Sequence, residues 1–222
     1  MESDPDSAMT ILKHIPTPES LHGKAQADYS LLMTQAMDKN YMKFTSDSLI
    51  KFAVGYYGSY TEDIVSKGKA FYYYGRVMES LDKVEDAMKF YLKAKDVLGN
   101  SHEYKLLGLM SEGIGNLNRK QKLFDAALND FRASLQFYSQ IPDSLGISFA
   151  YRNIGRVFLY KGQLDSAYHY FDKALHIANI KKYPSASSIL LEVGVIHRSA
   201  NDYLGAENCF LSFIEKETNK DN

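Results

Sequence analysis

The chain has 222 residues, 45% of them hydrophobic, and a formal net charge of −1. This near-neutral balance gives no basic character that would indicate a nucleic-acid partner. No apolar run reaches the length of about 18 residues that a membrane helix needs, so we expect no membrane span in this chain. The single cysteine, Cys209, excludes an intrachain disulfide.

Small residues recur along the chain at steps of 39 or 40 residues. A large apolar residue follows each of them by four positions, and a second small residue precedes the last five by twelve. The three series are Ala8, Ser48, Ala87, Ala127, Ala167 and Ala206; Leu12, Phe52, Tyr91, Phe131, Phe171 and Phe210; and Ala36, Gly75, Gly115, Gly155 and Gly194. Such a regular register predicts stacked repeats rather than one globular core.

In chain order, residues 4–15 have the pattern of a second helix whose first helix is missing, so we expect a truncated repeat there. Residues 18–58 form the most degenerate complete repeat. Clearer repeats are expected at 62–100, 102–140, 143–181 and 184–217, followed by a tail at 218–222. We expect all of them to form one array that belongs to a longer protein.

The repeat around Gly155 shows the local pattern most clearly. Ile154, Gly155 and Phe158 share one face of a first helix, and Ala167 and Phe171 follow the helical period in a second. A glycine within a helix costs about 1 kcal/mol relative to alanine. Its repeated use therefore indicates a close approach of two helices, and the repeated unit is predicted to be a helical hairpin.

These residues, with Tyr151 and Ala174, resemble the tetratricopeptide repeat (TPR) family, whose pattern is W-x2-L-G-x2-Y…A-x3-F…P. The period near 40 exceeds the usual value of about 34, and the closing proline is absent. The resemblance implies an all-α fold, a right-handed superhelical array of antiparallel helical hairpins. Long-period arrays of this kind resemble those of peptide-sensing bacterial regulators and of motor or scaffold adaptors.

Nothing in the sequence supports catalysis. The segment "GIGNLN" lies inside a predicted helix, where a dinucleotide-binding loop cannot form. The six histidines have no metal-ligand spacing, and Cys209 fits the apolar side of a helix. We therefore expect no enzyme activity, no cofactor and no metal.

In TPR proteins the first helix of each hairpin lines a groove, and the resemblance implies the same here. The expected groove residues are Met33, Met37, Tyr72, Arg76, Asn116, Arg119, Arg152, Asn153, Arg156 and Arg198. Arginine bonds carboxylates and asparagine can pair with an extended backbone. We expect the partner to be a protein or an extended, acidic peptide segment. Met33 and Met37 fit a core position as well, and the charged set also fits a solvated face.

Arg152 and Arg156 have no acidic residue four positions away in their own helix. Like charges so placed repel by a few tenths of a kcal/mol. We expect their joint replacement by alanine to leave stability unchanged or slightly improved. Glu112 or Glu192 of a neighbouring repeat could instead pair with them, and the two arginines would then be structural.

Three functions remain open. The chain is expected to be a binding scaffold; the alternatives are a ligand sensor that signals to a C-terminal segment outside this sequence, and a structural array that assembles through its end repeats. "SDPDSAMTIL" resembles TPR regions of anaerobic gut bacteria that follow a lipoprotein-type export signal. That resemblance implies a location on the periplasmic side, with the cytoplasm as the alternative. The stretch "MESDPDSAMT" itself lacks the basic and apolar segments of a signal peptide.

Overall fold

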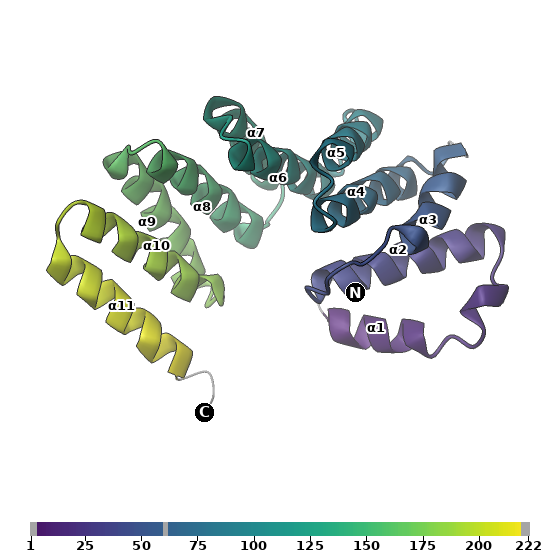
Figure 1. Cartoon of the computed structure of the whole chain (residues 1–222), viewed down its shortest axis with the longest axis horizontal. Coiled ribbons are helices and arrows are strands. Elements are labelled where there is room, and N and C mark those ends of the chain that lie inside the picture. Colours follow the sequence, from purple (N-terminus) through teal and green to yellow (C-terminus); the bar gives the residue numbers. More distant parts are fainter. Residues whose placement is uncertain (1–3, 60–61, 219–222) are drawn as a thin grey trace. The chain divides into compact units, whose positions relative to one another are not determined.

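The computed structural model describes residues 4–59 and 62–218, and every regular element in these ranges is a helix. The predicted all-α fold is confirmed. The elements are α1 (Pro5–Lys13), the 3-10 helix η1 (Pro18–Ser20), α2 (Gly23–Lys39), α3 (Ser48–Ser59), α4 (Ile64–Ser80), α5 (Val84–Leu98), α6 (Tyr104–Lys120), α7 (Phe124–Tyr138), α8 (Ser144–Tyr160), α9 (Leu164–Ile180), α10 (Ser185–Ser199) and α11 (Tyr203–Thr218) (Figure 1).

The helices pack in consecutive pairs, with α2 against α3, α4 against α5, α8 against α9 and α10 against α11 (Figure 1). The chain forms two compact units that meet within α6, the first ending at Ile114 and the second beginning at Gly115. Helix α1 packs on α2 in the first unit. Thr218, assigned to the tail from the sequence, is the last residue of α11, and the rest of the expected tail lies outside the described residues.

One turn conformation closes four of the hairpins. One residue of this turn adopts a left-handed backbone conformation, with φ between 59° and 73°. In the four hairpins, in chain order, this residue is Asp82, Lys122, Gly162 and Asn201. The next amide bonds back to the carbonyl five residues earlier, as Gln163 does to Phe158 at 2.9 Å. This arrangement satisfies carbonyls at the end of the first helix. Because each turn has the same length, consecutive hairpins keep the same register.

The predicted close approach of the two helices is present in the four later hairpins. A Cβ atom added to Gly75 would lie 2.6 Å from the Tyr91 ring, and one added to Gly115 would lie 2.8 Å from the Phe131 ring. The corresponding contacts are 3.1 Å at Gly155, to Phe171, and 2.5 Å at Gly194, to Phe210. The motif glycine therefore makes room for the aromatic ring of the second helix.

The register predicted for the first complete hairpin is wrong. Phe52, expected at the helix seam, is 51% exposed, and Ser48 is also exposed. Ile50, Ala53 and Tyr57 are buried instead. The connection between α2 and α3 runs from residue 40 to 47, longer than the turns of the later hairpins. The fixed spacing read from those hairpins therefore does not apply, and α3 turns a different face inward.

A pair of glycine substitutions in the first unit tests the close approach. We expect Gly75→Ala to lower the free energy of unfolding by about 1–3 kcal/mol, because the new methyl group must displace the buried Tyr91 ring. Gly55→Ala in α3 is the control, since nothing lies within 4 Å of its Cβ position. It should raise stability by up to about 1 kcal/mol through helix propensity. Urea unfolding followed by circular dichroism measures both, and stabilisation by both would contradict the seam at Gly75.

Candidate binding site

The expected groove residues fall into two sets, one in each unit. Met33 and Met37 belong to the first set. Met33 is 8% exposed and is buried with Met9, Leu12 and Ala36, and Met37 is partly buried against the same cluster. Both methionines thus contribute to the packing of α1 on α2. Met33 offers little surface to a ligand.

Arg76 on α4 is held by two carboxylates. Its Nη2 lies 2.9 Å from Asp38 Oδ1, its Nε donates to the same carboxylate, and its Nη1 lies 3.5 Å from Glu79 Oε2. Burial acts to lower the pKa of Arg76, but charges around it, including that of Asp38, raise that pKa above its ordinary value. Tyr72, only 6% exposed, lies beside Tyr91. Carboxylates thus lie at all three nitrogens of the Arg76 guanidinium, although its side chain is 37% exposed.

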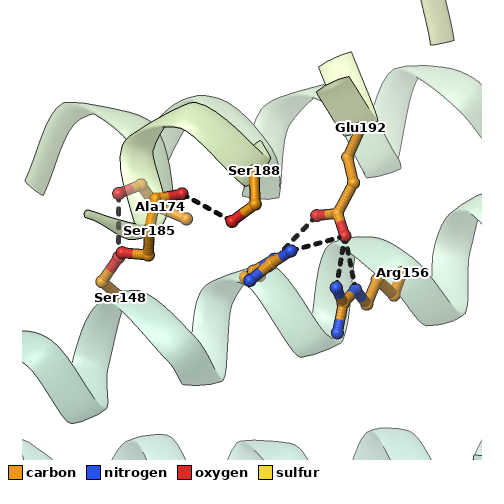
Figure 2. Close-up of polar contacts among 7 residues, drawn as sticks. Ser148, Arg156, Ala174, Ser185, Ser188 and Glu192 are labelled. Atoms are coloured by element: carbon orange, nitrogen blue, oxygen red, sulfur yellow. Dashed lines mark hydrogen bonds and ion pairs between the residues drawn. The ribbon is translucent and has the colours of Figure 1, made fainter. Parts of the chain in front are cut away.

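The second unit holds a different arrangement, built on α8 and α10. Arg152 Nε and Nη2 donate to Glu192 Oε2 and Oε1 at 2.9 and 3.0 Å. Arg156 Nε donates to Glu192 Oε1 at 2.6 Å, and its Nη2 lies 2.5 Å from the same oxygen. Figure 2 shows the Glu192 carboxylate directed at Arg156. One carboxylate therefore joins two guanidinium groups.

Repeat spacing brings these three residues together. Arg152 and Arg156 are one helical turn apart on α8 and share a face. Glu192 follows them by 40 and 36 residues, which is one repeat, and therefore lies on the neighbouring first helix. The sequence named Glu192 as a possible partner, and the structure confirms it. The bridging carboxylate offsets the repulsion between the two arginines.

The cluster remains positively charged. Two guanidinium groups share one carboxylate, which leaves a charge of +1 (from the residue types in the cluster). The side chains of Arg152 and Glu192 are 14% and 17% exposed, whereas that of Arg156 is 31% exposed. Within the described part of the chain, no partner lies at Arg156 Nη1. The outer edge of this guanidinium can accept a further anion.

A second feature of this unit lies where α6 ends. The Arg119 guanidinium is 5.7 Å from the centre of the Tyr160 ring and donates to Asn116 Oδ1 at 3.3 Å. Tyr160 is 61% exposed and stacks on Phe124, with ring centroids 6.1 Å apart. Tyr160 is not among the ten groove residues predicted from the sequence, which places it only at the edge of the groove. An exposed aromatic ring one turn after Arg156 was the signal that could have identified it.

The two remaining predicted residues differ in accessibility. Asn153 is 4% exposed and has almost no surface for a ligand. Arg198, near the end of α10, is exposed. We call the side chains of Asn116, Arg119, Arg152, Arg156 and Tyr160 the arginine surface, and we include Arg198 of α10 because the sequence predicted it as a groove residue. The described ranges contain no group of three His, Cys, Asp or Glu side chains placed to hold a metal, and no helix in them is suited to cross a membrane.

Because both arginines bond to Glu192, the effect of their joint replacement on stability should differ from the effect expected from the sequence. We expect Arg152→Ala/Arg156→Ala to destabilise the protein by about 1–3 kcal/mol, because Glu192 is left half-buried without its partners. Adding Glu192→Ala should recover part of this loss, since the unpaired charge is then removed as well. Chemical unfolding of the wild type and the two variants measures both effects. Arg198→Ala, at an exposed position, should stay within about 0.5 kcal/mol of the wild type. A triple variant no more stable than the double one would show that pairing to Glu192 is not the cause.

Comparison with known proteins identifies the repeat. Residues 106–180, which cover most of α6 and all of α7 to α9, match the family model described as tetratricopeptide repeat. No sequence among the curated proteins matches the chain.

Several solved structures share the fold. BtubC (BKLC) from P. vanneervenii matches with a TM-score of 0.77 and 13% identity, over 100% of this chain and 89% of that one. A Rap protein complexed with competence and sporulation factor matches with a TM-score of 0.81 and 17% identity, over 93% of this chain. This chain spans only 58% of the Rap protein's length.

A putative kinesin light chain from Podosopora anserina, with nearly identical TPR-like repeats, matches with a TM-score of 0.69 and 11% identity, over 94% of this chain and 99% of that one. Identities this low show that the fold is shared, and they carry no information about ligands. Together with the glycine-aromatic seams, they show that the chain has a TPR-like helical repeat fold, and residues 106–180 match the tetratricopeptide repeat family itself.

Proposed function

We propose that this chain is a non-catalytic scaffold that binds an extended, acidic protein segment on the arginine surface. The observation that carries the proposal is the sharing of Glu192 between Arg152 and Arg156. Since one carboxylate cannot neutralise two guanidinium groups, the cluster retains a positive charge. A carboxylate on a ligand would neutralise it.

Arg156 is the anchor in this proposal. Its Nε and Nη2 are held by Glu192, so the guanidinium is fixed before a ligand arrives. Its outer edge, formed by Nη1 and Nη2, has the geometry for a carboxylate bound through two hydrogen bonds. A side chain that is already ordered loses less conformational entropy on binding than a mobile one.

The spacing of the helices favours an extended ligand. The Arg152 and Arg156 side chains of α8 reach Glu192 of α10, and an extended chain advances about 3.3–3.6 Å per residue. An extended ligand of a few residues would thus span both helices. Arg156 and Arg198 offer cations on these two helices, and Arg119 offers another on α6.

The residues around the arginines suit a polypeptide. The exposed Tyr160 ring provides a flat apolar contact, and the Asn116 amide can pair with a ligand backbone. The fold is also one in which binding is known, since the Rap protein of the same fold is complexed with competence and sporulation factor. These points support a binding role and leave the partner's identity open.

A peptide titration tests the proposal. We expect a fluorescent peptide of alternating Glu and Ser to bind, and the same peptide with Gln in place of Glu to bind much more weakly. Arg198→Ala should reduce the affinity for the Glu peptide about two- to fivefold, as expected for a partly exposed ion pair. Binding should weaken further as salt is raised. Fluorescence anisotropy measures each of these affinities.

Arg132→Ala is the matched control, because Arg132 is an exposed arginine on a second helix, α7. It should leave the affinity unchanged. Equal losses from the two variants would show that binding depends on net charge alone. If the Glu and Gln peptides bind equally, the arginine surface does not select acidic segments.

A further inference from the structure

A cavity of about 320 Å³ opens between the end of α9, the start of α10 and α11. It is separate from the residues of the arginine surface. Ala178, Ala186 and Ser187 are buried parts of its wall, and exposed residues form its rim. The complete lining is Ala178, Asn179, Lys182, Tyr183, Pro184, Ala186, Ser187 and Lys216. Its volume is within the range of small-molecule sites.

The repeat register explains why space is left here. Ala178 follows Tyr138 of α7 by 40 residues and Leu98 of α5 by 80. Leu98 and Tyr138 are both buried, and each fills the space at the end of its second helix. The Tyr138 ring, for example, lies so close to Gly146 that a Cβ atom there would be 2.6 Å away. The methyl group of Ala178 cannot fill the same space.

One buried polar group in the cavity wall has no partner. Ser187 is 4% exposed, and within the described ranges neither its hydroxyl nor its amide makes a hydrogen bond. Ser148, one repeat earlier, is equally buried, but its hydroxyl donates to the Ala174 carbonyl at 2.9 Å (Figure 2). The Ser187 oxygen is not among the fully enclosed unpartnered atoms of the described ranges, so it retains access to the cavity that the residue lines. A ligand in the cavity can provide a hydrogen-bond partner.

The start of α10 also lacks a cap. Asp143 accepts from the Gly146 amide at 2.9 Å at the start of α8, and Asp63 accepts from the Ser66 amide at the start of α4. In α10 the capping position is Pro184, which has no side-chain acceptor. The amide at the matching place in the first turn is that of Ser187. The positive end of the α10 dipole therefore lacks the capping carboxylate that the first helices α4 and α8 have, as do the starts of α2, α5, α7 and α9.

The charged groups of the cavity have one sign. Lys182 and Lys216 are both exposed at the rim, and no acidic side chain belongs to the lining. Lys216 Nζ donates to Asn179 Oδ1 at 2.9 Å, which leaves the Asn179 amide nitrogen as a further donor. Cations and hydrogen-bond donors thus dominate the polar lining.

We propose that this cavity binds the phosphate group of a small organic molecule. The phosphate would lie between Lys182 and Lys216 and accept hydrogen bonds from the Ser187 hydroxyl and amide, in the place of a capping carboxylate. The Tyr183 ring, Pro184 and the two alanines would contact the apolar part of the molecule. Lysine ammonium groups and an uncapped helix start together favour a doubly charged anion over a single carboxylate.

Calorimetric titration with phenyl phosphate, inorganic phosphate and benzoate tests this assignment. Phenyl phosphate should bind most tightly, because it alone uses both the donors and the apolar wall. Inorganic phosphate should bind more weakly, and benzoate more weakly than phenyl phosphate. Benzoate binding as tightly as phenyl phosphate would overturn the assignment to a phosphate group. Equal affinities for the two phosphates would overturn the organic part of the proposal.

Two lysine variants make the test specific to the cavity. Lys182 and Lys122 both occupy left-handed positions in turns, with φ of 55° and 61°, but only Lys182 lines the cavity. Lys182→Gln should weaken phenyl phosphate binding about tenfold, while Lys122→Gln should leave it unchanged. Equal effects would overturn the proposal.

A third variant closes the cavity. Ala178→Leu introduces the side chain that Leu98 provides in α5, and it should abolish phenyl phosphate binding. Its circular dichroism spectrum and unfolding midpoint show whether the fold is intact. Ser187→Ala adds a variant with little risk to folding, since the hydroxyl that it removes has no partner within the described ranges, and it should also weaken binding. Unchanged binding by a folded Ala178→Leu protein together with unchanged binding by Ser187→Ala would overturn the proposed position.

Discussion

The contact between a glycine of the first helix and an aromatic ring of the second is the constraint on which each later hairpin depends. A single added carbon at Gly75, Gly115 or Gly194 would come within 2.5 to 2.8 Å of that ring. The two helices can therefore approach this closely at that level only because the residue there is glycine. With a turn of constant length beyond it, the seam fixes which face of the first helix points inward and which side chains remain on its other faces. The chemistry of those faces follows from the register.

The two units share this register, but the sign of the excess charge around their arginines differs. In the first unit Arg76 is surrounded by the carboxylates of Asp38 and Glu79, so negative charge is in excess there. In the second unit Arg152 and Arg156 share the carboxylate of Glu192, and positive charge is in excess. A half-buried cluster is screened less by salt than charges on an open surface. Attraction for an acidic segment would therefore arise locally in the second unit, although the whole chain is almost neutral.

The sequence predicted the hairpins and the four later seams because these depend on short, repeated spacings. It failed at α3, where the longer connection from residue 40 to 47 breaks the register and Phe52 becomes exposed. It left Met33 undecided, because a methionine one turn from another fits a core and a groove equally well. The pairing of Glu192 was named only as one option, since it depends on which carboxylate of a neighbouring repeat lies at the same level. The cavity was missed because it results from a small side chain, that of Ala178, at a position where the earlier repeats have large ones. A motif search looks for residues that are present and does not detect unfilled space.

Helix α10 connects the two proposed sites. Ser187 and Glu192 are five residues apart on it, which at about 100° per residue places their side chains roughly 140° apart around its axis. One face thus meets the cavity and another meets the arginines of α8, so a ligand at one site does not block the other directly. Both ligands would nevertheless bind only where α10 is folded in place, and each would stabilise that state by mass action. Any energetic coupling between them must then be reciprocal, and it would pass through the position of this single helix.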